Sequence, residues 1–302
     1  MVRQKPSYLK TYQSGELQNK IKKLSQILNH CSLCPRSCGV NRLRGEVGYC
    51  KAGAELKVAS AFPHFGEEHP LVAKRGSGTI FLSHCNLLCM FCQNYEISHL
   101  GEGKTVTSGD FARIMIYLQS QGCHNINFVT PTHYVPQIMA ALPAAIEMGL
   151  NIPIVYNCGG YESIEVIKLL EGIVDIYMPD IKFSDSKKAR KYANAPNYFR
   201  VTKLVLKEMH RQVGVLKIDE KGIAFRGLLI RHLVMPDDVA GSEKILTFIA
   251  KELSTESYVN IMAQYRPCYN ALYDANISRP ITENEYHKVI HFAREIGLKR
   301  GF

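Results

Sequence analysis

Three cysteines with metal-ligand spacing, Cys85, Cys89 and Cys92, are the residues of this 302-residue chain best suited to chemistry. They follow the spacing C-x3-C-x2-C and come directly after an apolar run at 79–82, which predicts a buried strand that ends in a cysteine loop. Thiolates hold iron–sulfur clusters, and a 4Fe–4S cluster normally takes four of them. Three thiolates would leave one iron open to a small molecule, like the open position of a catalytic zinc. The spacing therefore predicts a 4Fe–4S cluster with a free coordination site; a zinc loop or three buried thiols is the structural alternative.

A second cysteine group precedes the first, with the spacing C-x2-C-x3-C-x11-C: Cys31, Cys34, Cys38 and Cys50. The intervening residues 39–49 carry turn glycines and few apolar side chains, so this segment cannot bury a core of its own, and a metal would supply the missing staple. Four thiolates suit either structural zinc or an auxiliary 4Fe–4S cluster, and the short glycine-rich loop favours zinc.

The same segment is basic, which also allows a zinc ribbon that binds nucleic acid. Its cations are Arg36, Arg42, Arg44 and Lys51. Aromatic side chains on which bases could stack are limited to Tyr49, so nucleic acid is an unlikely partner on this pattern.

Composition sets the class of protein. Residues 1–15 are polar and lack the apolar stretch of a signal peptide, and no apolar run reaches membrane-spanning length, so we expect a cytoplasmic protein without a membrane partner. Thiols stay reduced in the cytoplasm, which makes clustered cysteines among the 10 in the chain metal ligands rather than disulfides. The net charge of +10 favours anionic ligands or an acidic partner, or simply reflects a solvated basic surface.

The elements that must position these residues alternate between strands and helices, which predicts a parallel sheet. Strands are expected at 78–84, 125–129, 152–156, 174–178, 228–234 and 258–263. Helices are expected at 109–121, 134–149, 162–172, 185–193, 197–212, 242–254 and 283–297, the last with a Thr282–Glu285 capping box. A hairpin is expected at 217–226, and six βα units are two fewer than a full barrel needs.

Before the barrel, the pattern predicts a helix at 15–28 capped by Ser14 and a strand at 55–62. The loop that follows, 62–70, contains Glu67 and Glu68, which are either substrate-binding groups or solvated loop charges, and we favour the latter. The expected domains are 1–75, a helix with the four-cysteine metal-binding module, and 76–302, the partial barrel.

The first cysteine loop resembles the signature of the radical S-adenosylmethionine (SAM) superfamily, in which an aromatic residue, here Phe91, precedes the last cysteine. Asn94 resembles the end of the Cys-His-Asn of glycyl-radical-enzyme activating enzymes, with Gln93 at the His place. Over residues 76–265 the chain is similar to pyruvate formate-lyase activating enzymes. The resemblance implies a partial (β/α)6 TIM-like barrel, a 4Fe–4S cluster, SAM bound at the open iron, and a low-potential electron donor (ferredoxin or flavodoxin). Reductive cleavage of SAM would give a 5′-deoxyadenosyl radical that abstracts hydrogen from a substrate.

The resemblance also implies a SAM site at the carboxyl ends of the strands, where parallel barrels place their chemistry. Asp180 and Lys182 form an Asp-x-Lys that would meet the ribose and the SAM carboxylate, and Arg231 would also pair with that carboxylate. Activating enzymes carry Gly-Gly-Glu where this chain has Thr130-Pro131-Thr132-His133, so a threonine hydroxyl or a backbone carbonyl would accept from the SAM amino group. The expected cofactor-binding residues are Phe91, Asn94, Thr130, Thr132, Asn157, Gly159, Asp180, Lys182, Arg231 and Gln264; no side chain is assigned a catalytic role beyond binding.

The sequence therefore predicts a radical SAM enzyme, with a glycyl radical enzyme as its candidate protein substrate. One alternative is hydrogen abstraction from another peptide or a small molecule. An alternative of another class is a non-enzymatic metal-binding or nucleic-acid adaptor.

Overall fold

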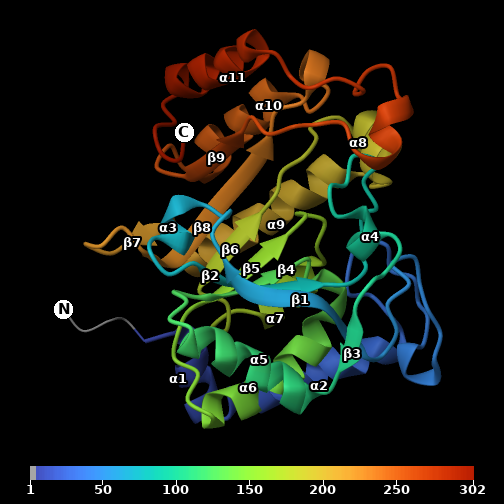
Figure 1. The fold of residues 1–302 in the computed structure, drawn as a ribbon, viewed down its shortest axis with the longest axis vertical. Coiled ribbons are helices and arrows are strands. Elements are labelled where there is room, and N and C mark those ends of the chain that lie inside the picture. Colours follow the sequence, from blue (N-terminus) through green and yellow to red (C-terminus); the bar gives the residue numbers. More distant parts are fainter. Residues whose placement is uncertain (1–4) are drawn as a thin grey trace.

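The computed structural model describes residues 5–302, and its centre is one mostly parallel sheet (Figure 1). The strands are β1 Leu56–His64, β2 Ser77–Leu82, β3 Lys104–Val106, β4 Ile126–Val129, β5 Ile154–Cys158, β6 Ile176–Pro179, β7 Lys217–Ile218, β8 Ala224–Leu233 and β9 Tyr258–Met262. Their order is β3-β1-β2-β4-β5-β6-β8-β7, and β9 pairs with β8. The strands β2, β4, β5, β6, β8 and β9 pair in this order and are parallel to one another, whereas β7 and β8 form an antiparallel hairpin.

The sheet does not close into a barrel. Within residues 5–302, the strand ladder ends at β9 on one side and continues through antiparallel β1 and β3 on the other. This confirms the α/β class and the partial, unclosed barrel with six parallel strands. All six predicted parallel strands and the predicted hairpin are present.

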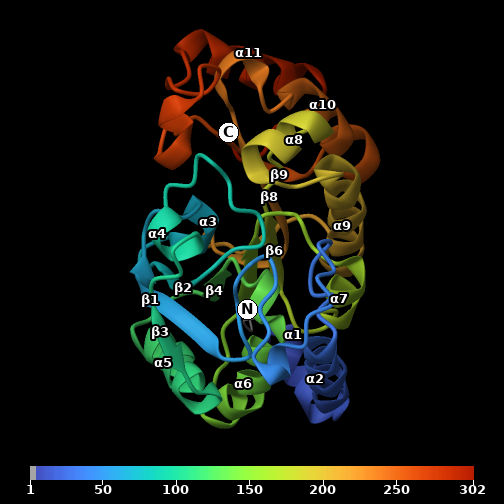
Figure 2. The same ribbon diagram turned by 90° about the vertical axis from the view of Figure 1, so that its right-hand side faces the viewer.

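Helices surround this sheet, most of them on its outer face (Figure 2). They are α1 Ser7–Gln13, α2 Glu16–Gln26, α3 His69–Val72, α4 Tyr95–Ser98, α5 Ser108–Ser120, α6 Val135–Glu147, α7 Ile164–Leu169, α8 Ser186–Ala193, α9 Tyr198–Val213, α10 Ser242–Phe248 and α11 Glu283–Glu295. In α5, Phe111, Met115 and Leu118 recur at helical spacing and are buried in the core shared with the sheet. The predicted Thr282–Glu285 capping box begins α11. The four-residue α3 and α4 and the short β3 carry too little periodicity to be predicted.

The segment before residue 76 shares the main sheet and core. Tyr8, Leu17 and Leu24 from α1 and α2 are fully buried in that core, and β1 pairs with β2. Ser14 does not cap α2: it ends α1 by donating its backbone N–H to Lys10 O, and Gly15, at φ 76°, precedes α2 instead. The predicted cap was wrong because a first helix runs directly into the second.

No helix within residues 5–302 combines the length and apolar character needed to cross a membrane.

Candidate active site

The cysteine loop, residues 83–94, leaves the carboxyl end of β2. Two of its non-glycine residues, His84 at φ 70° and Leu88 at φ 62°, adopt the left-handed conformation that side chains usually avoid. This backbone lets the Leu87 N–H point at Cys85 Sγ, at 3.4 Å, and the Ser98 hydroxyl lies 3.1 Å from Cys92 Sγ. Groups that donate to sulfur stabilise thiolate ligands, so the loop is suited to metal binding.

The thiols of this loop influence one another. The pKa of Cys85 is raised to about 11, mainly by burial and in part by the nearby Cys92, while the backbone N–H groups of Leu87 and Leu88 oppose the shift. Burial also raises the pKa of Cys89. The nearby Lys182 opposes this shift, and Cys85 and Cys92 add to it. In residues 5–302 no three His, Cys, Asp or Glu side chains already converge as a metal-ligand set, so a cluster would have to turn these thiols towards a common centre. Their shared loop, proximity and soft sulfur donors fit an iron–sulfur cluster.

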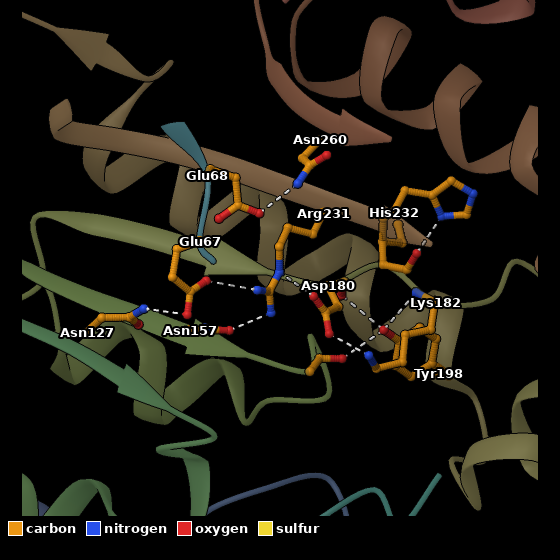
Figure 3. A network of polar contacts seen from close by, with 12 residues as sticks. Glu67, Glu68, Asn127, Asn157, Asp180, Lys182, Tyr198, Arg231, His232 and Asn260 are labelled. Atoms are coloured by element: carbon orange, nitrogen blue, oxygen red, sulfur yellow. Dashed lines mark hydrogen bonds and ion pairs between the residues drawn. The ribbon is translucent and has the colours of Figure 1, made fainter. Parts of the chain in front are cut away.

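A polar network lies at the carboxyl ends of the neighbouring strands (Figure 3). At its centre, Arg231 on β8 donates from Nε to Asp180 Oδ1 at 2.7 Å and from Nη2 to Asn157 Oδ1 at 2.6 Å. Lys182 Nζ pairs with the second oxygen of Asp180. Burial alone would raise the pKa of Asp180, but Arg231 and Lys182 outweigh it and hold that carboxyl below its usual range. The structure thus brings together four predicted residues, on or just after β5, β6 and β8, into one partly buried charged site: Asn157, Asp180, Lys182 and Arg231.

Two glutamates that the sequence suggested were solvated belong to this network. Glu67 Oε2 lies 3.5 Å from Arg231 Nη1, and its Oε1 accepts from Asn127 at 3.1 Å. Glu68 is 8% exposed and accepts from Asn260 at 2.8 Å. The interpretation as loop charges was wrong because the β1–β2 connection turns into the sheet interior, which no local pattern signals. Burial raises the pKa of Glu67, and Arg231 partly offsets this.

Backbone contacts hold the strand ends close to the cysteine loop. The Tyr198 hydroxyl donates to Gly159 O at 2.7 Å and accepts from the Lys182 N–H at 3.0 Å. A Cβ at position 159 would lie 2.5 Å from Leu87 Cδ1 and would have to displace that side chain, so glycine allows the end of β5 to pack closely against the cysteine loop. Tyr198 was not predicted, since it begins a helix far along the chain.

The remaining predicted cofactor residues are placed less uniformly. Phe91 is buried, with its ring centroid 6.0 Å from that of Phe183. Thr130, at φ 58°, is half-buried and donates its backbone N–H to Asn157 O. Asn94 and Gln264 are exposed. Thr132 is fully buried and donates its hydroxyl to Glu162 Oε1 at 2.8 Å.

Glu162 is a buried carboxyl that the sequence analysis did not single out. Besides Thr132, the Tyr156 hydroxyl donates to it at 2.9 Å. Burial raises its pKa from 4.5 to about 7, although these hydrogen bonds oppose the shift. The folded protein therefore keeps Glu162 protonated up to about pH 7, whereas the unfolded chain releases the proton near pH 4.5.

We expect Glu162→Gln to stabilise the protein at pH 8 but not at pH 5. Between pH 4.5 and 7 the unfolded state binds fewer protons, so this group lowers the free energy of unfolding as pH rises, by about 3 kcal/mol in all. Glutamine imitates the protonated acid and removes that loss. Urea unfolding of wild type and variant at pH 5 and pH 8 measures the change in the free energy of unfolding. The control is Glu165→Gln, which changes an exposed carboxylate. An equal effect of Glu162→Gln at both pH values would refute the assignment.

The four cysteines of residues 31–50, which we call the four-cysteine segment, line one cavity of about 20 Å³, together with Arg42 and His133. The backbone arranges them tightly: the Cys31 N–H donates to Val40 O, the Gly39 N–H donates to Cys31 O, and the Tyr49 N–H lies 3.4 Å from Cys38 Sγ. A cavity of this size holds about one water-sized atom. Four thiols around one small cavity form a donor set that fits a metal site.

Comparison with known proteins gives a family. A family model described as the radical SAM superfamily matches residues 79–218. The chain is 34% identical over 292 residues to the uncharacterized protein MJ0674 of Methanocaldococcus jannaschii. The matched residues make up 93% of this chain and 79% of that protein.

Two solved structures resemble parts of the fold. Methylornithine synthase (PylB) matches with a TM-score of 0.48 and 15% identity, over 72% of this chain and 62% of that one. QueE from Escherichia coli matches with a TM-score of 0.32 and 12% identity, over 68% of this chain and 95% of that one. At these scores, neither structure bears on the activity. The family match, the C-x3-C-x2-C loop at the end of β2 and the unclosed parallel sheet agree with one another, and residues 79–218 of the chain belong to the radical SAM superfamily.

Proposed function

We propose that this enzyme binds SAM between the cysteine loop and the Asp180–Arg231 network. We further propose that the 5′-deoxyadenosyl radical formed when SAM is cleaved abstracts hydrogen from a glycine of a glycyl radical enzyme. The superfamily implies a 4Fe–4S cluster and SAM, and its members generally need a reductant. Cys85, Cys89 and Cys92 would hold the cluster, which would supply the one electron needed to cleave SAM into methionine and a 5′-deoxyadenosyl radical. The observation that carries the SAM site is the partly buried group of opposite charges at the strand ends, which lies beside the cysteine loop: Tyr198 joins Lys182 to Gly159, and Gly159 packs against Leu87.

The residues of the network divide the binding between them. Arg231 and Lys182 are the cations available to the SAM carboxylate, and Asp180, shared between them, is the acceptor for the ribose hydroxyls. Asn157 holds the guanidinium of Arg231 in orientation. With the Thr132 hydroxyl donated to Glu162, Thr130 and the backbone around it are the acceptors left for the SAM amino group. Phe91, Asn94, Gly159 and Gln264 complete the proposed site.

A protein substrate is favoured over a small molecule by exposed apolar side chains on segments next to the cysteine loop. Leu100, Leu272 and Tyr273 are 64%, 56% and 87% exposed. The segment 95–100 and the segment 269–273 lie side by side, since the ring centroids of Tyr95 and Tyr269 stack 4.8 Å apart. Covering such side chains with another protein removes apolar surface from water. Hydrogen abstraction from a different peptide remains the second candidate.

Anaerobic assay tests the proposal in two stages. The reconstituted protein, reduced with dithionite, should convert SAM to 5′-deoxyadenosine. Incubation with a candidate glycyl radical enzyme should then produce a glycyl radical signal in electron paramagnetic resonance. Absence of 5′-deoxyadenosine formation would contradict the SAM site, whereas its formation without any glycyl radical would move the substrate to the second candidate.

Metal analysis should give about one zinc and about four irons per chain. The physical reason is the donor set, since four thiols on one short glycine-rich segment suit one tetrahedral ion. Elemental analysis of the reconstituted protein measures both metals. Near eight irons with no zinc would assign the segment to an auxiliary cluster.

A further inference from the structure

The guanidinium of Arg36, in the middle of the four-cysteine segment, reaches into the cysteine loop. Its Nε donates to Asn86 O at 2.6 Å, and its Nη2 lies 3.4 Å from Leu87 O and 2.7 Å from Asn194 O. Asn86 and Leu87 stand between Cys85 and Cys89. One charged side chain thus satisfies consecutive carbonyls of the loop proposed to hold the cluster.

The position of Arg36 is set by cysteines of its own segment. Arg36 lies between Cys34 and Cys38, and its Cζ stacks 3.4 Å from the ring centroid of Tyr49. Tyr49 in turn precedes Cys50 and points its backbone N–H at Cys38 Sγ. An ion shared by these cysteines would therefore fix both the guanidinium and the ring on which it stacks.

A second arginine of the segment connects to the start of the same loop. Arg42, 1% exposed, donates to His133 O at 2.6 Å. The imidazole Nε2 of His133 lies 2.8 Å from Ser83 O, two residues before Cys85. The segment thus supports the cysteine loop at its beginning and in its middle.

The cysteine loop needs such support because of its backbone. His84 and Leu88 hold left-handed conformations, which cost energy for residues with a side chain and persist only when the surroundings impose them. The four-cysteine segment buries few apolar side chains, Leu33 among them, so without an ion it has little to hold its own shape.

We propose that the four-cysteine segment is a metal-dependent brace for the cysteine loop: an ion bound by Cys31, Cys34, Cys38 and Cys50 fixes Arg36 against Asn86 and Leu87, and thereby secures the cluster on Cys85, Cys89 and Cys92. Arg36 is a positioning residue, since it acts through the backbone of the loop. This inference rests on the proposed function only in requiring the cluster to be present.

The test uses the reconstituted holoprotein and follows the release of cluster iron to a chelator under anaerobic conditions. Arg36→Ala should release iron about tenfold or more faster than wild type, because hydrogen bonds from a charged donor are lost at the loop. Its zinc content should stay unchanged, and its circular dichroism spectrum should show a protein folded like wild type. The matched control is Arg44→Ala, which removes the same charge from an exposed position of the same segment and should release iron at the wild-type rate.

A second pair of variants tests the dependence on the ion. Cys34→Ser should lose zinc and release iron at least as fast as Arg36→Ala, because loss of the ion loosens both Arg36 and Arg42. The double variant should be no faster than Cys34→Ser alone, because Arg36 braces the loop only while the ion holds the segment in place. Wild-type iron release in Arg36→Ala, or in a folded Cys34→Ser protein without zinc, would overturn the inference. Such a result would leave the proposed function standing, whereas a wild-type protein that assembles no cluster would refute the proposed function itself.

Discussion

Cys89→Ala should reduce 5′-deoxyadenosine formation to background and lower the iron content from about four atoms to near zero. Cys89 is the most enclosed of the three thiols in the cysteine loop, 8% exposed, and its pKa responds to both of the others. Two thiolates cannot hold a 4Fe–4S cluster firmly. Visible absorption, iron analysis and the dithionite-driven cleavage assay on anaerobically reconstituted protein provide the measurements.

The matched control for this variant is Cys123→Ala. Cys123 is also buried, at 3% exposed, but it lies outside both cysteine groups. Its replacement should leave iron content and SAM cleavage at wild-type levels, which separates loss of a ligand from loss of a buried sulfur. A Cys89→Ala protein that cleaves SAM at the wild-type rate would exclude Cys89 as a cluster ligand.

Asp180→Asn should weaken SAM binding by about ten- to a hundredfold. A hydrogen bond to a charged group contributes roughly 1.5–3 kcal/mol, and asparagine keeps the shape of the side chain while losing the charge. Because Asp180 also neutralises Arg231 and Lys182, the variant should in addition lower the free energy of unfolding by about 2–3 kcal/mol. Equilibrium titration with SAM and urea unfolding measure the two effects.

Iron content should not change in this variant, since no proposed cluster ligand is touched. Asp185→Asn is the control: Asp185 is an exposed carboxylate that caps α8, where asparagine caps equally well. It should bind SAM as wild type does. An Asp180→Asn protein with an intact cluster and unchanged SAM affinity would leave Asp180 a structural ion-pair partner and withdraw β6 from the SAM site.

Part of the site could be predicted because its residues follow local patterns. Asp180, Lys182, Asn157 and Arg231 each stand in or just after a strand whose apolar run is visible in the sequence. Parallel strands place their carboxyl ends at the same edge, so four residues distant in sequence were expected to meet, and their side chains do meet.

The sequence by itself determined the chemistry-bearing loop and the class of fold. The spacing of the three cysteines lies within eight residues and is visible in the sequence. Strands and helices are likewise signalled locally, by apolar residues that recur with periods of two and 3.6. The contacts between residues that are far apart in the sequence are known only from the tertiary structure. Glu67 meets Arg231 across 164 residues, Arg36 meets Asn86 across 50, and Thr132 meets Glu162 across 30. These contacts depend on which way each connection turns, and that direction is set by the packing of the whole core rather than by the residues of the connection.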